Sequence, residues 1–142
     1  MFLTRMIYAS TATDKFKPED IANILTKANH YNKSKDLTGM LCFSRNFFLQ
    51  CIEGSRSNVN ELYQKIASDK RHSDIVVLNY KEIDERAFSE WSMAYLPESK
   101  LTSTLVLKFS ENSQLLPYNL SGESAHKLIM ALRDDLDLVT KS

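Results

Sequence analysis

Two polar side chains occupy positions where apolar ones are expected. Gln50 lies on the apolar face of residues 47–53 if this segment is a strand. Tyr8 lies on the corresponding face of residues 2–9, which are also apolar and strand-like. A buried amide needs hydrogen-bond partners, and a tyrosine hydroxyl can both donate and accept. The two side chains are therefore either satisfied structural groups, which the pattern alone favours, or members of a polar site.

Motifs for the commonest enzymatic chemistries are absent from the sequence. The three glycines, at positions 39, 54 and 122, are too far apart for a phosphate-binding loop or a dinucleotide fingerprint. The three histidines lack the close spacing of metal ligands, and no motif for a hydrolytic nucleophile is present. Cys42 and Cys51 have no companion ligands, so we expect two buried thiols. The sequence predicts neither a hydrolase nor a metal centre.

Two helices are predicted by apolar residues that recur at helical spacing. Pro18 and two acidic residues begin the first helix, and the polar residues 32–36 end it. Its apolar stripe consists of Ile21, Ile24, Leu25 and Ala28. The second helix follows the hydroxyl-bearing cap at residues 55–57, and its stripe consists of Val59, Leu62, Tyr63 and Ile66. Each helix therefore has one face that can pack on a sheet.

Five short apolar segments predict strands. They are residues 2–9, 39–43, 47–53, 75–80 and 88–96. In the last segment Trp91, Met93 and Tyr95 alternate with polar or small residues, so we expect these three side chains on one face. A polar loop joins the second and third strands, and its Asn46 can take the left-handed conformation.

The order of these elements predicts an α+β fold. It matches the ferredoxin-like βαββαβ arrangement, with a fifth strand added to a mixed sheet. Right-handed crossovers place both helices on one face of the sheet. Ile24 and Ile66 are then the apolar walls of a slot between the helices. Such slots are common ligand sites, although on pattern alone the simple packing of two helices on a sheet is the preferred explanation.

The pattern changes after residue 96, so we divide the chain into residues 1–96 and a C-terminal helical extension, residues 97–142. Ser121 caps the last helix. Its apolar stripe consists of Ala125, Leu128, Ile129, Leu132 and Leu136. We expect this stripe to cover the face of the sheet opposite the first two helices, with contact to another protein as the alternative.

The overall composition is typical of a soluble globular protein. The chain has 142 residues, 43% of them hydrophobic, and eighteen basic side chains balance eighteen acidic ones. Zero net charge disfavours nucleic acid and anionic membranes as partners. The longest wholly apolar run is residues 128–132, whereas a membrane-spanning helix needs about 20 apolar residues. The N-terminus lacks the pattern of a signal peptide, and we expect a cytoplasmic protein.

Five segments together resemble the BLUF family of blue-light sensors that use flavin. They are residues 3–10, 32–41, 48–54, 69–72 and 91–93, in the family's order and at similar spacing. The resemblance extends from about residue 2 to residue 96. It implies a ferredoxin-like sheet with the ring of a flavin, usually FAD, between the two helices. FMN and riboflavin remain alternatives to FAD.

The resemblance also implies roles for individual residues. Tyr8 and Gln50 match the photoactive pair, in which the glutamine bridges the tyrosine hydroxyl and the flavin. Asn32, which by itself indicates only a helix end, matches the asparagine at the other polar edge of the ring. The remaining implied roles are ring packing by Ile24 and Ile66, ribityl or phosphate binding by Arg71 and His72, and signal transmission from the fifth strand by Trp91 and Met93.

The family mechanism implied for the photoactive pair is reversible. Excited flavin takes an electron and a proton from the tyrosine, and the return of both leaves only the hydrogen bonds of the glutamine changed. The amide suits this task because it holds donors and an acceptor, so rotation or tautomerisation changes what it offers to the flavin. The implied result is a red-shifted lit form that relaxes in the dark.

Three positions depart from the family pattern. Tyr31 stands where His or Asn is common, residues 35–37 replace a glycine-isoleucine turn, and Asn46 stands where glycine is frequent. None of these positions belongs to the photoactive pair. We therefore expect altered flavin affinity or dark recovery rather than loss of the photochemistry.

The resemblance thus implies a photoreceptor that has no enzymatic activity of its own. Like the short members of the family, it is expected to signal through the fifth strand and the C-terminal region to a downstream partner protein and to form a homo-oligomer. Two alternatives remain open: a light-insensitive ferredoxin-like interaction module, and a ferredoxin-like enzyme that acts on a small molecule. Flavin colour and a response to illumination distinguish the photoreceptor from both.

Overall fold

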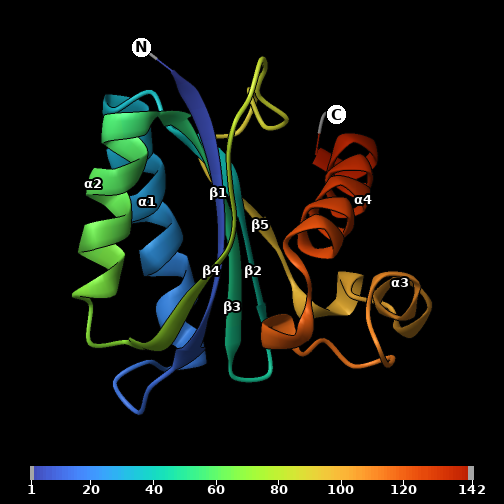
Figure 1. Ribbon diagram of the computed structural model, residues 1–142. Helices are drawn as coiled ribbons and strands as arrows, with labels where there is room; N and C mark the ends of the chain where they lie inside the picture. Colours follow the sequence, from blue (N-terminus) through green and yellow to red (C-terminus); the bar gives the residue numbers. More distant parts are fainter. Residues whose placement is uncertain (1, 141–142) are drawn as a thin grey trace.

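The computed structural model describes the backbone of residues 2–140 and the side chains of residues 2–136; residues 141–142 of the predicted extension lie outside the described residues. A five-stranded sheet separates two helical layers, with α1 and α2 on one face and α3 and α4 on the other (Figure 1). The strands are β1 (Leu3–Ala12), β2 (Thr38–Ser44), β3 (Phe47–Ser55), β4 (His72–Glu82) and β5 (Ala94–Leu96). The helices are α1 (Ile21–Ser34), α2 (Arg56–Ala67), α3 (Ser103–Phe109) and α4 (Gly122–Thr140).

The sheet has the topology that the sequence predicts. Its strands are ordered β4-β1-β3-β2-β5. Neighbouring strands are antiparallel except for β2 and β5, which are parallel, so the sheet is mixed. Because α1 connects β1 to β2 and α2 connects β3 to β4, the arrangement is ferredoxin-like with a fifth strand at one edge. The predicted α+β fold class is confirmed.

Local interactions mark the ends of the two crossover helices. A short 3-10 turn, Pro18–Asp20, leads into α1, where the proline needs no hydrogen-bond acceptor. The Ser55 hydroxyl caps α2 by accepting a hydrogen bond from the backbone N–H of Asn58 at 3.3 Å. After α1, Asp36 takes a left-handed backbone with φ of 53° and directs the chain into β2.

The loop between β2 and β3 differs from the prediction in one respect. Arg45, with φ of 59°, takes the left-handed conformation in place of Asn46. The backbone C=O of Asn46 accepts a hydrogen bond from the N–H of Ala12 at 2.7 Å. The loop is therefore tied to the end of β1 by a contact that the local sequence does not indicate.

The face of the sheet under α3 and α4 carries one continuous apolar core. Strand residues such as Ile7 and Leu49 pack with Leu128 and Leu132 of α4 in this cluster, which we call the α4-side core. The apolar stripe of α4 therefore packs on the sheet of its own chain. The division of the chain at residue 96 stays a prediction. No helix within residues 2–140 is both long and apolar enough to cross a membrane.

Both cysteines are buried thiols, as the sequence predicts. Cys42 and Cys51 point from β2 and β3 into the α4-side core. Burial raises the pKa of Cys42 to about 12 and also raises that of Cys51. Neither thiol therefore has the thiolate character that redox chemistry requires.

On the face under α1 and α2 the apolar packing is divided into two clusters. One surrounds Tyr8 and Val59, and the other surrounds Phe48 and Met93. Gln50 lies on β3 between these clusters, because Phe48 belongs to one and Ile52 to the other. The division places a polar side chain in the middle of this face.

The fifth strand is shorter than the alternation of residues 88–96 predicts. Only Ala94–Leu96 pairs with β2, and residues 88–93 are irregular. The buried carboxylate of Glu53 accepts hydrogen bonds from the backbone N–H groups of Ala87 and Phe88, at 2.7 and 3.0 Å. These bonds to a side chain take the place of the ladder bonds that a longer strand needs.

The expectation that Trp91 and Met93 share a face is therefore wrong. Met93 packs with Phe48 on the face under α1 and α2. Trp91 packs against the α4-side core, with its ring 6.2 Å from that of Phe88. The short segment that contains both residues thus reaches both faces of the sheet.

Candidate functional site

A cavity of about 270 Å³ lies between α1, α2 and the sheet. Its volume is close to the lower limit of usual small-molecule sites, which is about 300 Å³. Among the residues with predicted roles, those that line it are Tyr8, Ile24, Asn32, Gln50, Ile66, Arg71, His72 and Met93. Trp91 does not line it. Residues from both crossover helices and from four strands thus meet where the sequence predicts a slot.

Tyr8 and Gln50 face each other across β1 and β3. They are direct partners in the antiparallel register, where opposite Cβ atoms lie about 4.5–5.5 Å apart. The Tyr8 hydroxyl donates a hydrogen bond to Gln50 Oε1, and Gln50 Nε2 donates to Met93 Sδ at 3.5 Å. A buried chain of polar contacts therefore connects the phenol to the thioether along the wall of the cavity.

The environment of Tyr8 keeps its hydroxyl protonated. Burial raises the pKa of Tyr8 far above its usual value of 10.0, and the negative charge of Asp69 adds to the effect. The ring of Tyr63 meets the Tyr8 ring edge to face, with centroids 6.2 Å apart. Tyr8 is therefore a neutral donor toward Gln50 throughout the physiological pH range.

Asn32 has one satisfied and one unsatisfied polar atom. Its Nδ2 donates to the backbone C=O of Ser92 at 2.7 Å. Its Oδ1 is buried and has no hydrogen-bond partner among the described residues. A native protein seldom leaves such an acceptor unpaired, because the lost hydration costs about 1–3 kcal/mol. Asn32 lies within α1, near the end of the helix at Ser34.

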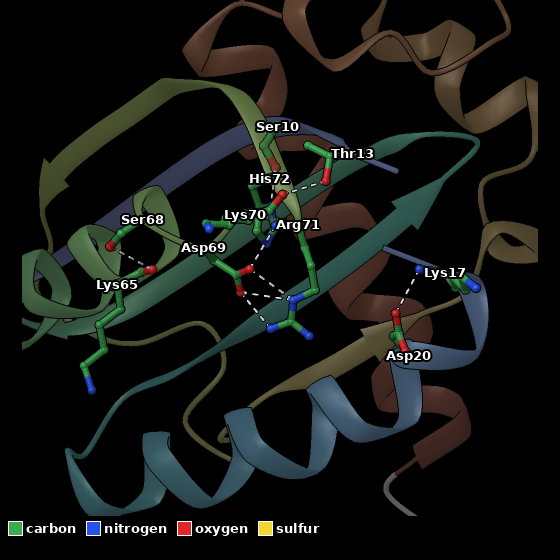
Figure 2. Close-up of polar contacts among 10 residues, drawn as sticks. All are labelled: Ser10, Thr13, Lys17, Asp20, Lys65, Ser68, Asp69, Lys70, Arg71 and His72. Atoms are coloured by element: carbon green, nitrogen blue, oxygen red, sulfur yellow. Dashed lines mark hydrogen bonds and ion pairs between the residues drawn. The ribbon is translucent and has the colours of Figure 1, made fainter. Parts of the chain in front are cut away.

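The end of the cavity near β4 is polar. Arg71 donates from Nε and Nη2 to the Asp69 carboxylate, at 3.1 and 2.7 Å to the nearest oxygens (Figure 2). The hydrogen bonds from Arg71 lower the pKa of Asp69. His72 Nδ1 shares a hydrogen bond of 2.8 Å with the Ser10 hydroxyl, and its ring lies 4.5 Å from that of Phe48. Burial lowers the pKa of His72, which favours the neutral ring.

Several residues that line the cavity carry no predicted role. Tyr31 from α1 donates to Glu61 Oε1 at 3.2 Å, and the Lys65 ammonium lies 4.4 Å from the centre of the Tyr31 ring. The others are Lys27, Ala28, Leu41, Phe48, Leu62 and Asp69. Polar residues on the exposed side of a helix resemble any solvated surface in sequence, so their approach to the cavity becomes visible only in the fold. Tyr31 is the exception, because its departure from the family pattern had already drawn attention to this position in the sequence.

Known proteins with similar sequences are light-regulated. The family model for "Sensors of blue-light using FAD" matches residues 3–94. Photoactivated adenylate cyclase subunit beta of Euglena longa is 33% identical over 102 residues, which are 71% of this chain but only 12% of that protein. The blue light- and temperature-regulated antirepressor BluF of Escherichia coli is 34% identical over 91 residues, covering 64% of this chain and 23% of that protein.

The fold leads to the same group of proteins. A solved structure of BlsA in its photo-activated state superposes with a TM-score of 0.83 at 32% sequence identity, over 92% of this chain and 94% of that one. No group of three or more His, Cys, Asp or Glu residues that could hold a metal ion occurs in the described part of the chain. By the family match over most of its length, the chain belongs to the BLUF family of flavin-using blue-light sensors.

Proposed function

We propose that this chain binds a flavin in the cavity between α1 and α2 and converts blue light into a rearrangement of Gln50. The observation that carries the proposal is the buried polar chain from the Tyr8 hydroxyl through Gln50 to Met93 Sδ, which lies in the cavity wall. A redox-active phenol and an amide in contact are the two groups that the family mechanism requires. Their burial excludes water from both.

The residues of the cavity fit a flavin ring. Ile24 and Ile66 supply apolar contact from the two helices, as the flat faces of the ring require. The unpaired Oδ1 of Asn32 supplies an acceptor, and a flavin carries an imide N–H donor. Because an unpaired buried acceptor is costly, binding of that donor removes a penalty that the protein otherwise bears.

FAD is the proposed resident flavin. The three common flavins share the ring, and FAD and FMN carry phosphate on the tail whereas riboflavin does not, so the charges that line the cavity distinguish the phosphate-bearing flavins from riboflavin. Arg71, Lys27 and Lys65 line the cavity, against the single carboxylate of Asp69. This excess of positive charge favours FAD or FMN over riboflavin, and titration with each of the three measures the preference.

The side chains support a reversible proton movement. A bound flavin supplies blue-light absorption and a strongly oxidising excited state. Tyr8 holds its hydroxyl proton on the hydrogen bond to Gln50 Oε1, and a phenol that loses an electron becomes a strong acid, so this proton can move to the amide. Gln50 holds both donors and an acceptor, and rotation or tautomerisation exchanges the group that faces Tyr8.

A changed Gln50 alters the contact with Met93, because Nε2 and Oε1 differ in what they offer the sulfur. Met93 belongs to the segment that also carries Trp91 into the α4-side core. We propose that this segment transmits the change to a downstream partner protein, which must bind the two states with different affinity. A homo-oligomer is part of the proposal by analogy with short members of the family.

The substitution Tyr8→Phe tests the proposal. The variant should bind flavin and should show no persistent red shift of its absorption spectrum after blue illumination, because the electron and proton donor is gone. Tyr80→Phe, at an exposed tyrosine on β4, is the matched control and should photoconvert normally. A persistent red shift in Tyr8→Phe contradicts the mechanism. A wild-type protein that neither retains nor binds flavin contradicts the function itself.

A further inference from the structure

The segment 91–93 is held to α1 by a side chain to which neither the family resemblance nor the cavity assigns a role. Asn29 Oδ1 accepts a hydrogen bond from the Ser92 hydroxyl. Asn29 Nδ2 donates to the backbone C=O of Met93 at 3.4 Å and to that of Leu25 at 2.9 Å. One amide therefore contacts two consecutive residues of the segment that connects the cavity to the α4-side core.

The contacts of Asn29 are specific to the orientation of its amide. The Leu25 carbonyl lies one helical turn earlier and can only accept, so it fixes Nδ2 on its side of the amide. Oδ1 is consequently the atom that faces the Ser92 hydroxyl. Asn29 does not line the cavity, and so its amide interacts with the polypeptide rather than with a ligand.

The clamped segment has a different neighbour at each end. Met93 Sδ accepts from Gln50 on the cavity side. Trp91 packs in the α4-side core, and its backbone C=O accepts from the N–H of Gly39 on β2 at 3.1 Å. A shift of Met93 therefore reaches Trp91 through only one intervening residue, Ser92, and this residue is the one that Asn29 binds.

We propose that Asn29 is a positioning residue that holds segment 91–93 in its resting place and thereby sets the rate at which the lit state returns to the dark state. This inference rests on the proposed function. The bonds to Ser92 and Met93 stabilise the resting arrangement. They also lower the energy of the transition state for the return to the dark state, because they are partly re-formed there. Their loss leaves the displaced arrangement unaffected, so the return becomes slower.

The first measurement needs neither flavin nor light. Trp91 is the only tryptophan of the chain, so its emission reports on this segment alone. In Asn29→Ala kept in the dark, quenching of Trp91 fluorescence by acrylamide should increase, because the bonds of Asn29 to Ser92 and Met93 are lost and only the bond from Asn32 to the Ser92 backbone still ties the segment to α1. Asn23→Ala replaces an exposed asparagine of the same helix and should leave the quenching unchanged.

The second measurement is the recovery of the dark absorption spectrum after a flash. Asn29→Ala should recover about fivefold more slowly than the wild type, the effect of losing about one net hydrogen bond at the barrier. Ser92→Ala removes the hydroxyl from the other side and should slow recovery similarly, whereas Ser92→Thr keeps a hydroxyl and should stay near the wild-type rate. The double variant should recover as slowly as Asn29→Ala, because the bond to the Ser92 hydroxyl is already lost in that variant.

The outcomes separate the two proposals. Slower recovery and stronger quenching in both Asn29→Ala and Ser92→Ala support the clamp, and wild-type values in both variants overturn it. If Asn29→Ala does not fold, Ser92→Ala decides, since Ser92 lies outside the helices and strands. If the wild type shows no red-shifted state, the proposed function fails, and the quenching in the dark alone then decides whether Asn29 clamps the segment.

Discussion

The two faces of the sheet are built from the same strands but differ in how completely they are packed. Under α4, alternate strand residues and the helix form one unbroken apolar cluster. Under α1 and α2, the corresponding residues form two clusters, with Gln50 and the cavity between them. A polar side chain in the middle of an otherwise apolar face thus coincides with the place where packing leaves a cavity.

Each face also holds a buried polar group, and the contrast between them is informative. Glu53 is only 1% exposed, yet its carboxylate accepts from the Thr38 hydroxyl and from two backbone N–H groups. Asn32 is equally buried, and its Oδ1 has no such partner in the described part of the chain. The two groups are equally buried and differ in the completeness of their hydrogen bonds, and the unpaired oxygen is the observation on which the proposed binding role of Asn32 rests.

The largest effect on the free energy of unfolding should come from a substitution that creates a cavity in the α4-side core. Leu128→Ala removes a fully buried side chain of α4, and we expect a loss of about 2–5 kcal/mol in the free energy of unfolding. Leu107→Ala, at a leucine that is 54% exposed, should change it by less than about 0.5 kcal/mol. Urea unfolding followed by circular dichroism measures both. Similar losses for the two variants would contradict the assignment of this face to stability.

The second-largest effect on the free energy of unfolding is expected from replacing Gln50, the polar side chain on the face under α1 and α2. Gln50→Leu leaves the buried Tyr8 hydroxyl without its acceptor and should cost about 1–3 kcal/mol of unfolding free energy. The double variant Tyr8→Phe/Gln50→Leu removes both partners, so we expect it to unfold within about 1 kcal/mol of the wild type. A double variant that is less stable than Gln50→Leu alone would show that the pair also contributes to stability.

Asn32→Ala should weaken flavin binding by about tenfold, because a buried hydrogen bond to the ring is worth about 1–1.5 kcal/mol. Equilibrium titration of the flavin-free protein measures the affinity. Asn23→Ala, which changes the same residue type at an exposed position of the same helix, should bind flavin as the wild type does. Equal affinities for the three proteins would contradict the proposed role of Asn32.

The smallest effect is the dependence of stability on pH. Burial lowers the pKa of His72 on the cavity side and of His126 on α4 below the usual 6.5. A histidine whose pKa is lower in the folded state takes up its proton more readily when unfolded, so stability is full above about pH 6.5 and declines as the pH falls. His72→Gln should flatten this decline in urea unfolding measured at a series of pH values.

The elements around the cavity could be predicted from the sequence because their patterns are local. The stripe of Ile24 and the stripe of Ile66 repeat at helical spacing, and both residues line the cavity as expected. The alternation in residues 88–96 was equally regular, yet it did not produce a strand of that length. The Glu53 carboxylate, distant in sequence, binds the backbone at residues 87–88, and a periodicity argument has no access to such a bond.

The sequence by itself determined the fold class and the family, because alternation, helical spacing and short motifs are properties of neighbouring residues, whereas the pairing of Tyr8 with Gln50 was implied only by the family resemblance. Only the tertiary structure decided that Trp91 and Met93 lie on opposite faces, that Asn32 Oδ1 has no hydrogen-bond partner within the described residues and that Asn29 holds Ser92. The physical reason is that each of these depends on which groups from distant segments come within hydrogen-bond or van der Waals distance. Such contacts are set by packing and not by local pattern.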